Sequence, residues 1–283
     1  MFSSYTIPSD GGDYVFPNSN VILQQSKGLG NPDTKLGFHD YANAHGGILQ
    51  TQKYKSRTHN IGGMILGTDA ATFAQVRREL GRALSFLGVT KTVQATADDG
   101  TEVQFDVVGA SELAVDEEQG YKFSAPWNIS LLLPDPIIYS QDLYTASGGV
   151  ATLGGTGFAL PFSFPLALAG TVTGTFNALN NGNAKVYPIQ IKITGPGTSF
   201  LISNKTTGRD LLYNDTLIAG DYVIIDPKRR TAVKNGVTNV YGLITWSDWD
   251  LYYGNNTIAL AVGSGNTSDT GISALWRSGW WSV

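Results

Sequence analysis

The feature that most constrains the fold is a series of short alternating segments, separated by tight turn signals, between Tyr187 and Asn256. Ile189, Ile191 and Ile193 alternate with polar residues, which is the period of two expected of a half-buried strand. Asn235-Gly236 is a strong hairpin signal further along the same stretch. Short strands about every 8–12 residues with turns between them indicate a β-sandwich.

The composition agrees with a mainly β chain. Charged residues make up 15% of the sequence, well below the usual level of about 25%, and 34 of the 283 residues are Gly. Low charge and many glycines suit a turn-rich β protein, and also a surface that is largely covered by partners. The formal net charge of -4 gives no electrostatic argument for nucleic-acid binding.

Several classes of protein are disfavoured by what the sequence lacks. There is no cysteine, so disulfides, thiol nucleophiles and cysteine-based zinc sites are excluded. Met1 to Pro17 has no basic start followed by an apolar run, and so does not read as a secretion signal. The apolar stretches are shorter than the roughly 20 residues of a membrane span. We therefore expect synthesis and assembly in a cytoplasm, without membrane contact.

One segment has helical periodicity. Thr68 to Leu87 places apolar residues at steps of three and four, which gives one apolar face: Phe73, Val76, Leu80, Ala83, Leu84 and Leu87. Thr68 or Asp69 is suited to cap the start, and Gly88 to end the helix. Arg77 and Arg78 fall outside the apolar face and are expected to point to solvent or to a partner.

The sequence also predicts a long hairpin over residues 101–133. Val103, Phe105 and Val107 alternate with polar residues, and the return segment runs from Tyr121 to Leu133. Two arms of that length would span roughly 40 Å at ~3.3 Å per residue, which is longer than a small sandwich requires. Either the return strand bulges near Ala125-Pro126, or the hairpin extends beyond the body of its domain.

A domain boundary follows this hairpin. Pro134-Asp135-Pro136 ends the return strand, because proline cannot donate to a β-ladder. The stretch from Ala146 to Gly157 is small, polar and rich in glycine, as surface connections are. We predict two domains, residues 1–138 and residues 139–283.

The search for catalytic chemistry gives little. The Gly-x-Ser-x-Gly and Gly-x4-Gly-Lys-Ser/Thr motifs are absent, and Asp98-Asp99 and Glu117-Glu118 are adjacent acidic residues at turns. His39, His45 and His59 lack the spacing of a helical zinc site. Surface or turn histidines are the favoured interpretation, and a metal site formed with Asp13 or Asp40 is the alternative. We expect no enzyme activity and no cofactor.

Aromatic residues are the strongest binding signal. Trp246, Trp249, Tyr252 and Tyr253 crowd together, either to fill a sandwich core or to form an exposed platform for a sugar or a protein. Three more tryptophans lie near the end of the chain: Trp276, Trp280 and Trp281. Each offers roughly 150–250 Å² of surface, so we expect them to be mostly buried, on the chain itself or on a neighbouring subunit.

An ordered series of short motifs runs through the whole chain. In the N-terminal half it consists of Asp40, Gly46-Gly47, Arg57 with Ile61, Arg77-Arg78 and Asp135-Pro136. In the C-terminal half it consists of Pro161-Phe162-Ser163-Phe164-Pro165, Asn181-Gly182, Pro188, Gly195-Pro196, Asn204 to Gly208, Ala219-Gly220-Asp221, Ile225-Asp226, Arg230-Thr231, Asn235-Gly236 and Gly254 to Ile258. With these motifs in this order, the chain resembles the distal tail proteins of long-tailed, siphovirus-type phages.

The resemblance implies a structural protein of the virion tail tip, with a mainly β fold. Residues 1–138 would form a β domain with one α-helix and a long hairpin, or belt, arm, and would close a ring of six at the end of the tail tube. Residues 139–283 would form a galectin-like β-sandwich that projects outward. The implied partners are other copies of the chain, the tail tube protein, a tail-tip hub or tail-associated lysin protein, and receptor-binding proteins or side fibres.

These expectations give two sets of candidate residues. The candidate ring interface comprises Asp40, Arg57, Arg77, Arg78, Tyr121 and Phe123. The candidate docking residues for a partner or a sugar are Trp246, Trp249, Tyr252, Trp280 and Trp281. Sugar-binding galectins use a histidine-containing cluster, and no histidine follows His59 here. Galectin-type sugar binding is thus not supported. The alternative function is a carbohydrate-binding sandwich that acts through exposed aromatic residues instead.

Overall fold

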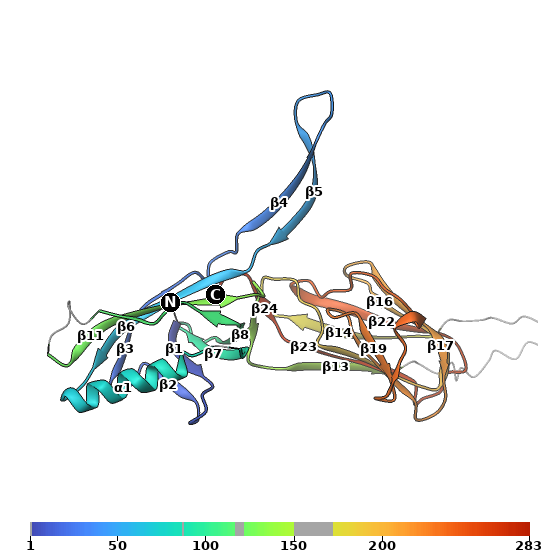
Figure 1. The fold of residues 1–283 in the computed structure, drawn as a ribbon. Coiled ribbons are helices and arrows are strands. Elements are labelled where there is room, and N and C mark those ends of the chain that lie inside the picture. Colours follow the sequence, from blue (N-terminus) through green and yellow to red (C-terminus); the bar gives the residue numbers. More distant parts are fainter. Residues whose placement is uncertain (1, 87, 117–121, 150–171) are drawn as a thin grey trace, which may run out of the picture. The chain divides into compact units, whose positions relative to one another are not determined.

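The protein is described here from a computed structural model, which defines residues 2–86, 88–116, 122–149 and 172–283. The chain divides into two compact units (Figure 1). Unit 1 contains residues 1–141 together with residues 280–283, and unit 2 contains residues 142–279. The predicted division lay between residues 138 and 139 and kept the C-terminal residues in the second domain.

Unit 1 contains two antiparallel sheets that share a core. The first sheet has the order β2-β1-β7-β8-β12-β24. Its strands are β1 (Phe2–Ile7), β2 (Tyr14–Phe16), β7 (Lys91–Ala97), β8 (Glu102–Val107), β12 (Ile138–Ser140) and β24 (Gly279–Trp280). The second has the order β10-β11-β6-β3, with β9 also paired to β11. Its strands are β3 (Val21–Lys27), β6 (Arg57–Leu66), β9 (Gly109–Ala110), β10 (Ala114–Val115) and β11 (Ser124–Leu133).

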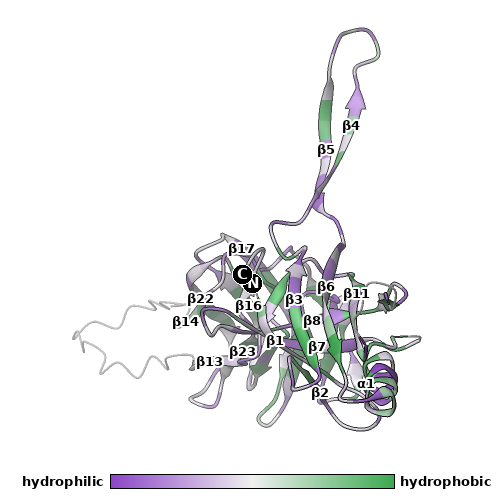
Figure 2. Ribbon diagram, turned by 90° about the vertical axis from the view of Figure 1, so that its left-hand side faces the viewer, coloured by the Kyte–Doolittle hydropathy of each residue, from purple (hydrophilic) through white to green (hydrophobic). Residues whose placement is uncertain are grey.

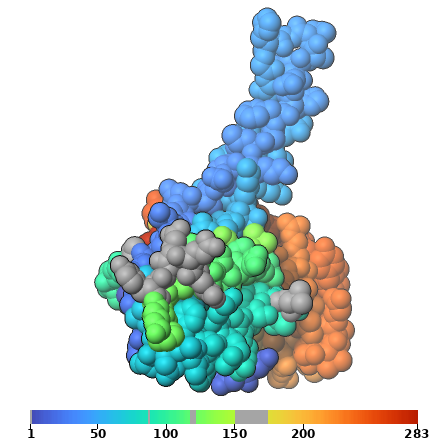
Figure 3. All heavy atoms as spheres, turned by 60° about the vertical axis from the view of Figure 1, so that its left-hand side comes forward, coloured from blue at the N-terminus to red at the C-terminus, as the bar shows by residue number. Residues whose placement is uncertain are grey.

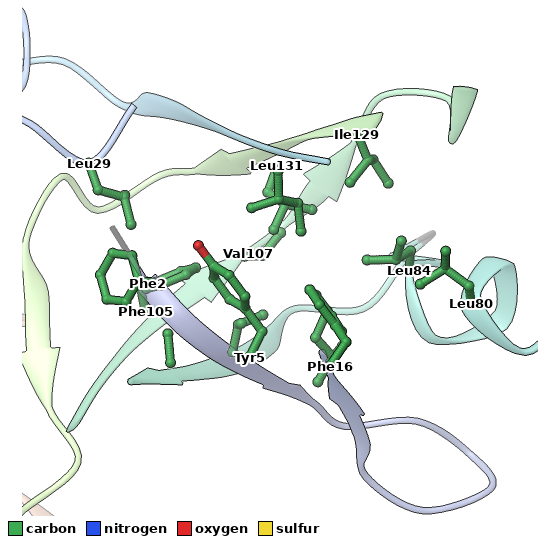
Figure 4. Packing of buried hydrophobic residues seen from close by; sticks show 14 of the residues in the cluster. Phe2, Tyr5, Phe16, Leu29, Leu80, Leu84, Phe105, Val107, Ile129 and Leu131 are labelled. Atoms are coloured by element: carbon green, nitrogen blue, oxygen red, sulfur yellow. The ribbon is translucent and has the colours of Figure 1, made fainter. Parts of the chain in front are cut away.

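Side chains from both sheets meet in the core of unit 1. Tyr5 and Phe16 from the first sheet face Ile129 and Leu131 from the second (Figure 4). The alternating burial along β8 and β11 gives each strand one apolar face toward this core. Trp127 stands edge-on to Phe16, with ring centroids 5.8 Å apart.

The predicted helix is present and shorter than expected. α1 runs from Ala70 to Ala83, and the Asp69 side chain accepts a hydrogen bond of 2.7 Å from the backbone N–H of Thr72. Caps of this kind contribute about 1 kcal/mol. Val76, Leu80 and Ala83 form the buried face. The mainly β fold with this α-helix is confirmed over the described residues.

The predicted hairpin over residues 101–133 is confirmed only in its later part. The short strands β9 and β10 pair antiparallel with the return strand β11, as a hairpin requires. β8 does not take part: it pairs with β7 and β12 in the first sheet, whereas β11 also pairs with β6 in the second. Alternation located β8 and β11 correctly, but it carries no information on which strand pairs with which.

A different hairpin stands alone. Within the described part of the chain, β4 (Thr34–Asp40) and β5 (Gly47–Tyr54) pair only with each other, and form a two-stranded sheet. Figure 1 draws them as a long twisted ribbon, and Figure 3 shows their atoms as a narrow column. We call residues 34–54 the arm.

Unit 2 contains two antiparallel sheets, as the alternating segments predict. One has the order β13-β23-β15-β18-β19-β20, and the other β14-β22-β16-β17-β21. The first comprises β13 (Tyr144–Gly149), β15 (Gln190–Thr194), β18 (Tyr222–Asp226), β19 (Thr231–Lys234), β20 (Thr238–Asn239) and β23 (Gly271–Trp276). The second comprises β14 (Val172–Asn180), β16 (Gly197–Asn204), β17 (Arg209–Leu217), β21 (Ile244–Thr245) and β22 (Gly254–Ser264), and the 3-10 turn η1 spans Tyr241–Leu243.

The turn chemistry of unit 2 agrees with the sequence. Asn235 and Gly236 both have positive φ, at 52° and 74°, between β19 and β20. Phe176 of one sheet lies against Gly148 of the other, where an added Cβ would come within 3.1 Å of its ring. The predicted motif Pro161 to Pro165 lies outside the described residues.

Candidate functional site

The arm is held together by its own backbone pairing. Its register runs from Thr34 opposite Tyr54 to Asp40 opposite Gly47, with one irregularity after Gly37. The backbone N–H of Tyr41 donates to the Gly46 carbonyl at 3.1 Å and begins the turn. Nearly every residue of both strands is exposed. A lone two-stranded hairpin is only marginally stable in water, so covering one face of this arm would stabilise it.

The two faces of the arm differ in chemistry. Residues directly opposite each other in a sheet share a face, and successive residues alternate between faces. One face therefore carries a set of apolar side chains that we call the apolar stripe: Leu36, Phe38, Leu49 and Tyr54. Their exposed fractions are 48%, 62%, 45% and 46%. Figure 2 shows apolar residues in green along the arm.

The other face of the arm is polar and basic. Lys35 stands directly opposite Lys53, and His39 opposite Ile48. Like charges in directly opposite positions destabilise a strand pair. The lysines therefore favour solvent or an acidic neighbour, and the apolar stripe is the face that gains from burial. Covering the exposed remainder of each stripe side chain would contribute about 1 kcal/mol.

The base of the arm is fixed by the last residues of the chain. The ring of Trp281 lies 4.2 Å from the ring of Tyr54, measured between centroids. The Nη1 atom of Arg57 donates to the carbonyls of Gly30 and Trp281, both at 2.9 Å. Trp280 is partly buried and packs against the hydrophobic core of unit 1. The C-terminal residues thus hold the point where the arm joins the unit.

Arg57 is placed inside unit 1. It is 7% exposed, and its Nε and Nη2 atoms have no hydrogen-bond partner. Burial lowers the pKa of its guanidinium to about 10, and the nearby Asp135 opposes this shift. Arg57 therefore stays charged at neutral pH, and orders the arm base through its donors.

His59 lies in a buried polar network next to Arg57. Its Nδ1 atom is 2.8 Å from the Lys27 carbonyl, and its Nε2 atom is 2.7 Å from the Tyr5 hydroxyl. Because a carbonyl only accepts, Nδ1 carries the proton and Nε2 accepts from Tyr5. Burial is the main cause that lowers the pKa of His59 to about 4; the Lys27 carbonyl opposes this shift, and the charge of Arg57 contributes to it. His59 is therefore a neutral core residue at pH 7.

The three histidines do not come together. His39 lies on β4 and His45 in the turn of the arm, whereas His59 is buried in unit 1. Across the described ranges, no group of three or more His, Asp or Glu side chains is placed to hold a metal ion. The described chain likewise offers no helix that could cross a membrane.

The other candidate interface residues lie at separate places on unit 1. Asp40 is exposed at the end of β4. Arg77 and Arg78 are exposed on α1, beside a groove of about 520 Å³. Phe123 is half-buried at the start of β11, with φ at 67°. Tyr121 lies outside the described residues.

Sequence reasoning missed the apolar stripe. Leu36 and Phe38 alternate with polar residues, and Gly46-Gly47 supplies a turn signal after them, so part of this hairpin could have been found. The signal was weak because the second strand does not alternate: Ile48 and Leu49 are adjacent in the sequence. Only the structure shows that this face is left uncovered.

The aromatic candidates of unit 2 divide between core and surface. Trp249 is fully buried, and Trp276 is buried with its Nε1 donating to the Leu179 carbonyl at 2.9 Å. Trp246 is half-buried and stacks on Tyr241, with centroids 5.4 Å apart. Tyr252 is exposed. Trp249 is thus a packing residue, and Trp246 and Tyr252 remain as surface groups.

The fold and these surfaces define a two-unit β protein with an exposed two-stranded arm. Residues 181–280 match the family described as the siphovirus-type tail component, C-terminal domain. A search of curated proteins finds no match.

Among solved structures, the chain is similar to the SPP1 Dit protein, described as a paradigm of the hub adsorption apparatus of phages that infect Gram-positive bacteria. The identity is 14%, the alignment covers 96% of this chain and 98% of that chain, and the TM-score is 0.65. The phage P2 baseplate in its activated conformation, with Ca or with Sr, matches at 12% identity over 97% of this chain and 98% of that chain, with a TM-score of 0.44.

The resemblance to the distal tail proteins is confirmed by these findings. The likeness to SPP1 Dit gives the fold over nearly the whole chain, and the family model gives the C-terminal domain. The family whose model matches is a component of phage tails, which agrees with the location predicted from the sequence.

Proposed function

We propose that this chain is a structural protein of the phage tail tip that assembles through unit 1 into a closed ring of six copies. The ring joins the end of the tail tube to the host-recognition apparatus. The match of residues 181–280 to a tail-component domain and the fold shared with SPP1 Dit support this role.

The observation that carries the proposal is the arm. Its strands pair with no other part of the described chain, and its apolar stripe is about half exposed. A surface of this kind is stabilised by a partner. When the same arm on every copy contacts a different surface of the next copy, the contact is heterologous, and it closes into a ring if the rotation allows.

The proposed partners follow from the same role. Unit 1 would contact other copies, the tail tube protein and a hub or tail-associated lysin protein. Unit 2 would carry receptor-binding proteins or side fibres. The role is structural and requires no catalytic step, no cofactor, no nucleic-acid contact and no membrane. Because Trp249 is buried, the carbohydrate-binding alternative rests on Trp246 and Tyr252 alone.

Light scattering on the purified protein tests the proposal directly. A ring of six predicts a species of six times the chain mass of 30.3 kDa, with a ring visible by negative-stain electron microscopy. A chain that remains monomeric at every concentration, and that is absent from rings in purified virions, would overturn the proposal.

A further inference from the structure

We infer that the apolar stripe of the arm docks into a groove between α1 and β10 on unit 1 of a second copy. The inference rests on the proposed ring and identifies the surface that receives the arm. The groove has an apolar lining of Phe73, Leu113 and Val115, and Arg77 and Arg78 also line it. Its volume is about 520 Å³.

The groove is open because α1 presents small residues toward it. Ala74 and Gly81 line it, and a Cβ added to Gly81 would meet only Leu113, at 4.0 Å. Its volume falls within the range of about 300–1,000 Å³ that is typical of pockets for drug-sized ligands. Large side chains of the stripe such as Phe38 therefore fit by size as well as by polarity.

The charges on the two surfaces are complementary. Asp40 follows Leu36 and Phe38 at alternate positions on β4, so its carboxylate lies on the same face as the apolar stripe. Arg77 and Arg78 both line the groove, and Arg78 supplies the guanidinium group for this contact. Carboxylate–guanidinium pairs form strong, directional hydrogen bonds. Lys35 and Lys53 lie on the opposite face of the arm and are kept away from these arginines.

The occupant is a second copy and not the chain's own arm. The arm and the groove both belong to unit 1, and the stripe is exposed in the single chain. Among the residues that the structure describes, each copy therefore leaves the groove open and the stripe uncovered. Two such different surfaces on every copy are the requirement for a head-to-tail ring.

Cysteine cross-linking tests this placement, because the chain has no native cysteine. Gln52 lies on the stripe face, opposite Leu36, and Thr51 is its neighbour on the polar face, opposite Gly37. Chains with Gln52→Cys are co-assembled with chains carrying Ala74→Cys and treated with a short bismaleimide reagent. Thr51→Cys with Ala74→Cys is the matched control, and each single variant is treated alone.

The expected result is a cross-linked dimer from the Gln52→Cys and Ala74→Cys mixture, in at least about fivefold greater yield than from the control mixture. The yields should differ because the side chains of residues 51 and 52 point to opposite faces of the same strand. Rings that form without this cross-link, or with equal yield from both mixtures, would overturn the docking inference and leave the ring intact. Absence of rings from the unmodified chain would instead overturn the proposed function.

A charge exchange provides the second measurement. Asp40→Arg or Arg78→Glu alone is expected to raise the concentration needed for assembly roughly tenfold, because one like-charge contact replaces an attractive one. The double variant is expected to recover most of this loss. If the single variants assemble normally, or if the double variant is no better than either, Asp40 and Arg78 do not meet across the interface.

Discussion

The arm and the β16–β17 hairpin of unit 2 are built by the same local rules and have opposite surroundings. Both are antiparallel, both are closed by a short turn, and both contain one irregularity of register. β16 also pairs with β22, and β17 with β21, whereas the arm pairs with nothing else in the described chain. Phe200 and Tyr213 of β16–β17 are fully buried, whereas Phe38 of the arm is 62% exposed.

The difference shows where stability and function separate in this chain. Apolar side chains on β16–β17 are covered by their own unit, so substitutions there act on folding. The apolar side chains of the arm are left uncovered, so substitutions there should act on association. The same residue type, phenylalanine on a hairpin strand, therefore reports on two different equilibria.

Removing the arm should give the largest effect. Replacing residues 34–54 by a short Gly-Ser linker is expected to abolish ring formation, because the proposed contact surface is lost. Unit 1 should still fold, since its core residues lie outside the arm. Light scattering measures assembly, and hydrogen exchange measures the protection of β6 and β7. Rings formed by the deleted chain would show that the arm does not mediate assembly.

A matched pair of phenylalanines sharpens the comparison. Phe200→Ala should destabilise unit 2 by about 3–5 kcal/mol, as truncation of a buried aromatic residue does. Phe38→Ala should change the stability of the single chain by less than about 0.5 kcal/mol, and should weaken assembly. Urea unfolding at a concentration below assembly separates the two effects. Similar losses of stability from both variants would mean that Phe38 packs within its own chain.

The sequence predicted the parts of this fold that depend on local pattern. The helix, the alternating strands β8 and β11 and the Asn235-Gly236 turn are set by residues close together in the chain. The pairing of β8 with β11 was mispredicted, because β8 pairs with the preceding strand β7, whereas β11 pairs with the distant strand β6 in the other sheet. The arm was missed because its second strand does not alternate in the sequence. Only the shift of register between Gly37 and Phe38 places Leu49 on the same face as Leu36 and Phe38.

The candidate site residues likewise divide into those whose placement follows from local sequence pattern and those whose placement depends on distant parts of the chain. Exposure of Arg77 and Arg78 follows from helical periodicity, which the sequence contains. The burial of Arg57 depends on Gly30 and Trp281, far away along the chain, so no local pattern could reveal it. Trp249 and Trp246 lie close together in sequence and differ in burial, because only one of them points into the sandwich.

Acid should weaken unit 1 through His59, with an effect smaller than that of Phe200→Ala. The folded pKa of about 4 lies below the ordinary histidine value of 6.5, so between these pH values the unfolded chain binds a proton that the folded chain does not. The contribution of His59 is fully present above about pH 6.5 and is lost as the pH falls toward 4. The total is about 3 kcal/mol at ~1.36 kcal/mol per pKa unit.

Two histidine variants distinguish the contribution of His59 to the pH dependence of stability from that of other titratable groups. His59→Gln should flatten the slope of unit 1 stability between pH 6.5 and 4, whereas His39→Gln on the exposed arm should leave the slope unchanged. Urea midpoints measured across this range provide the comparison. An unchanged slope in His59→Gln would show that another group controls the acid response.

Two tyrosine–tryptophan contacts give the smallest predicted effect and the finest test of the comparison. The ring of Trp281 packs at a tilt against Tyr54 at the arm base, and Trp246 stacks on Tyr241 in unit 2. Both tryptophans are half-buried, so each alanine substitution should cost its own unit about 1 kcal/mol. Their effects on assembly should differ, because only Trp281 fixes the start of the arm.

Trp281→Ala should raise the concentration needed for ring formation several-fold, and Trp246→Ala should leave it unchanged. Light scattering across a dilution series measures both. If the two variants assemble equally well, the C-terminal residues stabilise unit 1 without orienting the arm, and the hydrogen bond from Arg57 to the Trp281 carbonyl then serves folding alone.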